Sequence, residues 1–105
     1  MVLGIFSVYD VKSNQYFSPF YAKNFELAKR SLTLSFNSES MLVHYPSDYS
    51  LWLLGEFDDE DGVITTVVID DDGNSVPARE RLVEIRELIP ESLQQFALDG
   101  SFKKN

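Results

Sequence analysis

The sequence predicts an α+β fold in which a small antiparallel sheet of about four strands, with a central hairpin, packs against two main helices and a C-terminal helical extension. Three observations indicate this class: short runs rich in β-branched and aromatic residues, apolar residues at helical spacing, and turns that contain Gly and Asp. At 105 residues the chain is expected to form a single domain, 1–105, with a flexible tail at about residues 99–105.

The first two strands are expected in the N-terminal part of the chain. Leu3–Tyr9 has the composition of a buried strand, and the run Tyr16–Tyr21 is aromatic and extended. Pro19 lies inside the second run and cannot donate a ladder hydrogen bond. We therefore predict an edge strand or a strand break there.

A helix is predicted after Asn24, whose side chain can cap its first turn. Its apolar positions recur at steps of three and four residues, at Phe25, Ala28, Leu32 and Phe36. A further turn is expected through Met41–Val43. Pro46 disfavours continuation of that helix past Tyr45.

The central hairpin is predicted around the segment Tyr49–Gly62, which contains the only tryptophan. An apolar run is followed by the acidic turn Asp58–Asp61 and by the β-rich run Val63–Ile69. We expect this hairpin, with Trp52, to form the core of the sheet.

The second main helix is predicted over Ala78–Ile89, because Pro77 suits a helix start. Its apolar face comprises Leu82, Ile85, Leu88 and Ile89. After Pro90, the segment Glu91–Leu98 is expected to add one short helix.

The net charge of −8 lies entirely in the second half of the chain. Residues 1–53 contain four acidic and four basic side chains, whereas residues 54–105 contain 13 acidic and 5 basic ones. Such a surface disfavours duplex DNA, whose binding depends on Lys and Arg. The absence of cysteine and of a signal or membrane-spanning segment favours a soluble protein of a reducing cytosol.

No catalytic, metal or cofactor motif emerges from the residues. The acidic turns at 58–61 and 70–72 lack the ligand spacing of a calcium loop, so we interpret them as solvated turns. His44 is the only histidine and is expected to cap or pack beside the Pro46 turn. We expect neither enzymatic activity nor a cofactor.

Aromatic and basic side chains are mixed in the first half of the chain, as they are in proteins that bind single-stranded nucleic acid. These candidate residues are Tyr9, Lys12, Phe17, Tyr21, Lys23, Lys29 and Arg30. The alternative interpretation is that the aromatic side chains build the core.

A second candidate surface is the acidic helix predicted at 78–89. It would present Glu80, Glu84, Glu87 and Leu88 to a basic protein partner, or it would form a homodimer. The alternative is that this helix only packs on the sheet.

Several separated segments together resemble the small nonstructural protein of gokushovirus-type microviruses, which are single-stranded DNA phages. They are FSVYD at 6–10, Lys12, Tyr16, PF at 19–20, Ala28 with Arg30, Pro46, DYSL at 48–51 and LGEFDD at 54–59. That family places His directly before the proline, whereas here Tyr45 intervenes between His44 and Pro46, and no family pattern continues beyond Asp70.

The resemblance implies a protein of the host cytoplasm that is not part of the virion. It would engage the replication complex or replicative-form DNA and promote packaging of new single strands into procapsids. Two hypotheses stay open: contact with phage replication and packaging proteins, or direct, sequence-nonspecific binding of single-stranded DNA.

Overall fold

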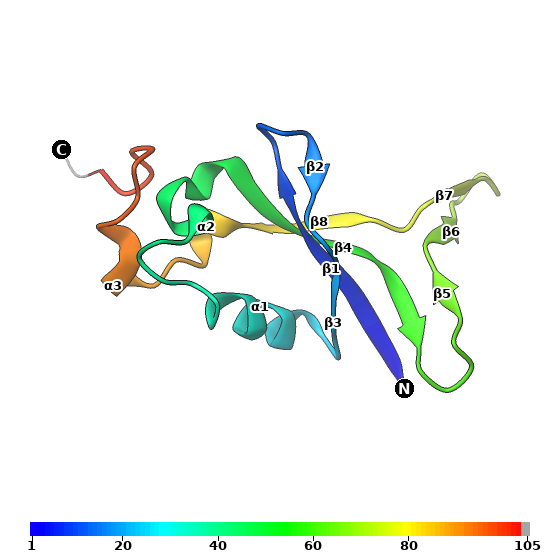
Figure 1. Cartoon of the computed structure of the whole chain (residues 1–105). Helices are drawn as coiled ribbons and strands as arrows, with labels where there is room; N and C mark the ends of the chain where they lie inside the picture. The colour runs from blue at the N-terminus through cyan, green and yellow to red at the C-terminus, as the bar shows by residue number, and fades with distance from the viewer. Residues whose placement is uncertain (104–105) are drawn as a thin grey trace.

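The computed structural model describes residues 1–103 (Figure 1). Its strands are β1 Val2–Asp10, β2 Gln15–Tyr16, β3 Phe20–Ala22, β4 Tyr49–Asp58, β5 Ile64–Thr65, β6 Val67–Ile69, β7 Ser75–Pro77 and β8 Glu80–Glu84. Its helices are α1 Phe25–Thr33, α2 Met41–His44 and α3 Glu91–Gln94, with single 3-10 turns at Pro46–Asp48 and Ile85–Glu87.

Six of the strands form one antiparallel sheet in which β1 and β4 are the central pair. β1 is bordered by β2 and β3 on its other edge, and β4 by β5 and β8. β6 and β7 form a separate two-stranded hairpin. The predicted α+β class is therefore confirmed.

The predicted strand break near Pro19 is confirmed. The run Tyr16–Tyr21 is divided between β2 and β3, which pair with opposite ends of β1. The segment between them stays attached, because the Phe17 backbone N–H donates to the Val8 carbonyl at 2.8 Å. Ser7 Oγ donates to the Phe17 carbonyl at 2.6 Å and also holds the segment between β2 and β3 against β1.

Helix α1 covers one face of the sheet, as Figure 1 shows. The predicted cap is confirmed, because the Leu27 N–H donates to Asn24 Oδ1 at 2.9 Å. The short helix predicted near Met41–Val43 is also present, as α2.

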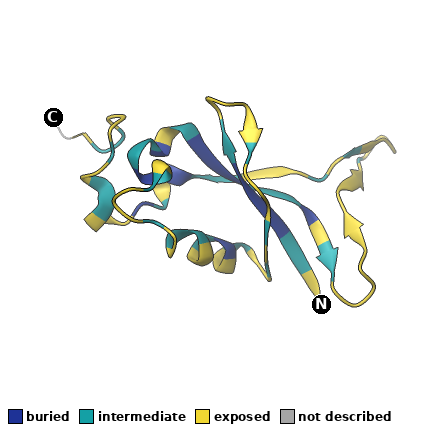
Figure 2. Ribbon diagram, viewed as in Figure 1, coloured by how far each residue is buried: buried dark blue, intermediate teal, exposed yellow. Residues whose placement is uncertain are grey.

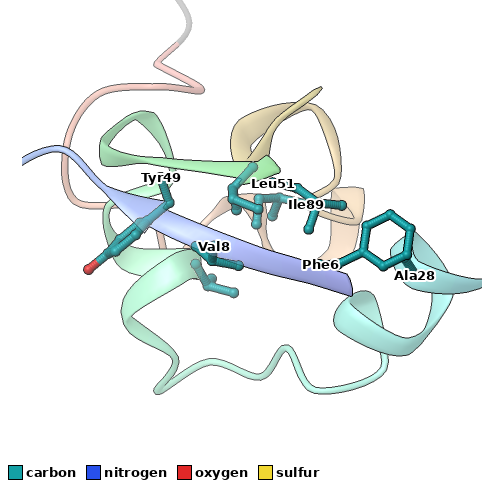
Figure 3. Packing of buried hydrophobic residues seen from close by; sticks show 8 residues of the cluster. Phe6, Val8, Ala28, Tyr49, Leu51 and Ile89 are labelled. Carbon is teal, nitrogen blue, oxygen red and sulfur yellow. The ribbon is translucent and has the colours of Figure 1, made fainter. Parts of the chain in front are cut away.

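The buried core lies between the sheet and the helices (Figure 2). Side chains from β1, β4, both N-terminal helices and the segment after β8 meet there (Figure 3). The cluster comprises Phe6, Val8, Ala28, Val43, Tyr49, Leu51, Ile85 and Ile89.

The prediction of a central hairpin built on Val63–Ile69 is wrong in its pairing. β5 makes only two residue pairs with β4, and β6 turns away to pair with β7. The long partner of β4 is β1, over pairs that run from Val2–Asp58 to Asp10–Tyr49. Trp52 is not in the core either, because alternate residues of a strand face opposite sides and Leu51 takes the buried position.

The prediction of a helix over Ala78–Ile89 is also wrong. Residues 80–84 form strand β8, and only one 3-10 turn follows, at Ile85–Glu87. The physical reason is the edge of β4, whose backbone groups near Ser50–Leu53 bond to β8. A nearby unpaired strand edge thus overrode the local helical spacing.

The C-terminal helical extension is shorter than predicted, since α3 ends at Gln94. The following segment contacts the body of the protein: the Ser47 N–H donates to Asp99 Oδ2 at 3.1 Å. Residues 104 and 105 of the predicted flexible tail lie outside the described residues. Within residues 1–103, no helix has the length and apolar character needed to cross a membrane.

Candidate functional site

The aromatic and basic residues predicted to bind single-stranded DNA do not gather on one surface. Tyr9 faces away from the core, opposite the side on which α1 lies, because it alternates with buried Val8 along β1. Lys29 and Arg30 lie on α1 itself. Lys29 Nζ is 2.9 Å from Glu26 Oε1 and lies 4.5 Å from the centre of the Phe25 ring.

The other predicted residues are divided in the same way. The Tyr21 ring contacts the Phe57 ring at 5.6 Å, and the Phe17 ring contacts that of buried Tyr49 at 5.7 Å between centres. Lys12 lies in the β1–β2 turn, and Lys23 lies immediately before the α1 cap. The first-half residues therefore form several local contacts rather than one continuous strip.

Tyr9 instead belongs to a group that we call the outer aromatic cluster: Tyr9, Tyr16 and Trp52. The ring centres of Tyr9 and Tyr16 are 4.7 Å apart, and Trp52 lies 6.3 Å from Tyr9 and 5.8 Å from Tyr16. All three side chains are half-buried. Sequence reasoning missed Tyr16 and Trp52 as site residues, because only the pairing of β1 with β2 and β4 brings them to Tyr9.

Hydrogen bonds hold the polar ends of this cluster. The Tyr9 hydroxyl donates to Asn14 Oδ1 at 3.1 Å, and Trp52 Nε1–H donates to Ser50 Oγ at 2.9 Å. Asn14 has a φ of 56°, a left-handed conformation that Asn tolerates in a turn. The orientation of the rings is thus coupled to the β1–β2 turn and to β4.

A cavity of about 330 Å³ lies beside the outer aromatic cluster. It is formed where β1, β4 and β8 meet the turn that precedes β4. Its lining residues are Tyr9, Val11, Ser47, Asp48, Tyr49, Ser50, Trp52, Arg81 and Glu84. We call it the outer cavity.

One acidic side chain of the outer cavity is neutralised by neighbours. Glu84 Oε1 accepts from Arg81 at 2.7 Å and Glu84 Oε2 from Arg86 at 2.9 Å. These two hydrogen bonds, that of Arg81 first, hold the pKa of Glu84 below its ordinary value. Arg81 is therefore committed to a carboxylate and is not a free phosphate ligand.

The second acidic side chain, Asp48, is half-buried and has no such neighbour. Within residues 1–103, no Lys, Arg or His side chain pairs with it. The pKa of the neighbouring Tyr49 hydroxyl is raised above its ordinary value, first by burial and then by the negative charges of Asp10 and Asp48. Three carboxylates, those of Asp10, Asp48 and Glu84, therefore surround the cavity against two guanidinium groups, those of Arg81 and Arg86, and the excess charge is negative.

The acidic residues predicted to form one face of a helix have other positions. Glu80 and Glu84 lie on β8, opposite Leu53 and Ser50 of β4, and Glu87 lies in the 3-10 turn before Leu88. They do not share a helical face, and Glu84 is already paired. Their role in partner binding stays a prediction.

The carboxylates that begin the two acidic turns accept backbone hydrogen bonds. Asp58 Oδ1 accepts the Glu60 N–H at 2.9 Å, and Asp70 Oδ1 accepts the N–H groups of Asp72 and Asn74 at 3.0 and 2.8 Å. Within the part of the chain that the structure describes, no three His, Cys, Asp or Glu side chains are arranged to hold a metal ion.

The second of these turns is the tip of a projecting hairpin, residues 66–78, which we call the arm (Figure 1). Its base is closed by the Ala78 N–H, which donates to the Thr66 carbonyl at 2.8 Å. Val67, Val68 and Ile69 are 47%, 48% and 67% exposed. The arm therefore displays apolar side chains on both of its faces, behind an acidic tip.

His44 lies away from the outer cavity, at the end of α2. Its Nε2 is 2.6 Å from the Ser38 carbonyl oxygen, so this nitrogen donates in the bond, and its ring packs edge-on against Tyr45. The packing expected beside the Pro46 turn is therefore present, and the hydrogen bond joins α2 to the turn between α1 and α2 rather than capping a helix end.

Comparison with known proteins gives one match. The model of the Phage ORF5 protein family matches residues 3–71, which comprise β1 through most of the first half of the arm. No curated protein and no solved structure matches the chain.

Proposed function

The chain belongs to the Phage ORF5 protein family, and from this premise we propose that it is a non-enzymatic phage protein that acts by contacting replication and packaging proteins. Its resemblance to the small nonstructural protein of gokushovirus-type microviruses supports the finer proposal. In this proposal it acts in the host cytoplasm, outside the virion, and promotes production of single-stranded DNA and its packaging into procapsids. It needs no cofactor for this role.

The arm is the observation that carries the proposal. An isolated two-stranded hairpin is at best marginally stable in water, and exposed β-branched residues on a short strand favour pairing with another chain. All three residues of β6 are exposed, and β7 is their only partner strand among the described residues. A protein partner that covers these side chains would stabilise the arm and gain apolar contact area.

Charge indicates what kind of partner this would be. The arm tip contributes Asp70, Asp71 and Asp72, and the separate turn between β4 and β5 contributes the acidic residues 58–61 (Figure 1). Complementary potentials accelerate association and select partners more than they strengthen binding. A basic phage protein that acts on DNA, such as the replication initiator, has the required charge.

The test is capture of the purified replication initiator by the whole chain and by charge variants. Asp71→Lys with Asp72→Lys should weaken capture at low salt and lower the yield of single-stranded phage DNA in infected cells. Glu39→Lys with Glu91→Lys, at two exposed positions beside α2 and α3, changes the net charge by the same amount away from the arm and is the matched control (Figure 1). Equal capture by the two variants would refute the role of the arm.

Self-association through the arm is the competing arrangement, and it is separable by light scattering. A homodimer would double the molar mass with rising concentration, and Val68→Asp would abolish the increase. A chain that stays monomeric and still captures the initiator supports the contact with a different protein.

Direct binding of single-stranded DNA is the second candidate, and the outer aromatic cluster favours it. Bases stack on such rings without sequence preference. A salt-titrated comparison of single-stranded DNA, duplex DNA and the initiator distinguishes the two functions. Unchanged single-strand affinity after Tyr9→Leu together with Lys12→Glu, which alter the outer aromatic cluster and the β1–β2 turn beside it, would exclude the direct-binding hypothesis.

A further inference from the structure

We propose that the outer cavity is a receptor site for one arginine side chain of a protein partner. The inference rests on three features that meet there: partly exposed aromatic rings, a carboxylate that pairs with no Lys, Arg or His side chain of residues 1–103, and a small volume. It deepens the proposed function, because a basic partner would supply the arginine. Its test, however, needs no partner protein.

The aromatic wall suits a planar cation. A guanidinium group over a tyrosine or tryptophan ring is attracted by the ring's electron-rich face. Tyr9 and Trp52 both line the cavity, and Tyr16 supports them from β2. Since the Tyr9 hydroxyl and the Trp52 N–H are bonded to Asn14 and Ser50, the rings are held before a ligand arrives.

The charges of the cavity select a cation and reject a phosphate. Arg81 and Arg86, both bonded to Glu84, contribute two positive charges, and Glu84 contributes one negative charge beside those of Asp10 and Asp48, which both act on the Tyr49 hydroxyl. Arg81 and Glu84 neutralise each other at 2.7 Å, so Asp48 is left to pair with an incoming group. An incoming phosphate would meet that same carboxylate and would be repelled.

The size of the cavity and the geometry of its groups favour a single arginine. Sites for small ligands usually have volumes of about 300–1,000 Å³, and the outer cavity, at about 330 Å³, is at the lower limit. Arginine can stack on an aromatic ring and donate to a carboxylate at the same time, whereas the lysine ammonium is a compact point charge.

The chain contains its own reporter, because the only tryptophan lines the cavity. Trp52 fluorescence would be followed while N-acetyl-arginine methylamide is added at constant ionic strength. The matched ligand is N-acetyl-citrulline methylamide, which has nearly the same shape but no charge. The arginine ligand should give a saturable change at concentrations where the citrulline ligand gives none. Identical responses to the two ligands would overturn the proposal.

Two variants locate the response within the protein. Asp48→Asn should raise the dissociation constant about tenfold, as expected for loss of a charged hydrogen-bond partner. Glu56→Gln removes the same charge at an exposed position of β4 opposite Gly4, outside the cavity and the arm, and should leave the constant unchanged. Tyr9→Leu should weaken binding with Asp48 intact, and circular dichroism would show whether each variant is folded. An effect of Glu56→Gln equal to that of Asp48→Asn would mean that only the net charge of the chain attracts the ligand, and the proposal would be overturned.

The same assay separates this inference from the proposed function. If the arginine ligand fails to bind the wild-type chain while the initiator is still captured through the arm, the cavity inference fails and the proposed function stands. If it binds while capture of the initiator fails, the receptor site stands without that partner. Displacement of the arginine ligand by oligothymidylate would instead make the cavity part of a nucleic-acid surface and would overturn the proposal.

Discussion

Replacement of Leu51 by alanine should test the core more directly than any other single change. Leu51 is 0% exposed and lies in β4 between β1 and β8. Because strands border it on both sides, the structure around the lost side chain has little freedom to collapse. Leucine-to-alanine changes in cores cost about 2–5 kcal/mol, and we expect about 3 kcal/mol here.

The matched control is Leu34→Ala, the same chemical change at a residue that is 79% exposed at the end of α1. It should change the free energy of unfolding by less than about 0.5 kcal/mol. Domains of this size have a stability of about 5–15 kcal/mol, so Leu51→Ala would remove a large share of it and lower the melting temperature by roughly 12–24 °C.

Urea unfolding followed by far-ultraviolet circular dichroism is the appropriate assay, since Trp52 adjoins the mutated residue and its fluorescence would change locally. The midpoint should fall while the slope of the unfolding free energy stays constant. A loss below about 1 kcal/mol for Leu51→Ala, or equal losses for the two variants, would refute the placement of Leu51 at the centre of the core.

Three further outcomes follow from single contacts. Asn24→Ala should cost about 1 kcal/mol in urea unfolding, because it removes the cap of α1; an unchanged midpoint would contradict that cap. Gly55→Ala should cost about 1–3 kcal/mol, because a Cβ there would meet the Thr65 carbonyl oxygen, and a neutral effect would show that β5 is free to move. The lowered pKa of Glu84 means that its contribution to stability is present above the ordinary value of 4.5 and is lost as the pH falls through the folded-state value. Wild type and Glu84→Gln should therefore differ in thermal stability near neutral pH and converge in acid, and a difference that persists in acid would contradict the ion pairs.

Local patterns predicted those elements whose partners are close in sequence. Asn24 and the spacing of Phe25 and Ala28 specify α1 within a single segment. Pro19 interrupts a strand for a reason that belongs to proline itself. The same kind of reasoning failed for residues 80–84, which contain a helical spacing of apolar residues but bond to a strand some thirty positions away. No local signal records that the edge of β4 is available.

The candidate site was harder to predict for the same reason. Tyr9 was identified from the mixture of aromatic and basic residues in the first half of the chain, but its nearest aromatic partners come from β2 and β4. The face of the sheet on which Trp52 lies depends on the register of β4, because successive side chains of a strand point to opposite faces. Asp48 was identified in the sequence only as part of the segment DYSL at 48–51, because its half-burial and the absence of a paired cation among residues 1–103 become visible only when its neighbours are known.

The late position of β8 has a consequence during synthesis on the ribosome. Translation at about 5–20 residues per second leaves the edge of β4 near Ser50–Leu53 without its partner for roughly 1 to 5 s after β4 is complete. Unpaired strand edges recruit other nascent chains into aggregates. A fragment that stops at residue 71, where the family match ends, never acquires residues 80–84. Such a fragment would keep that edge open permanently, so its recovery from cells should depend on chaperones in a way that recovery of the whole chain does not.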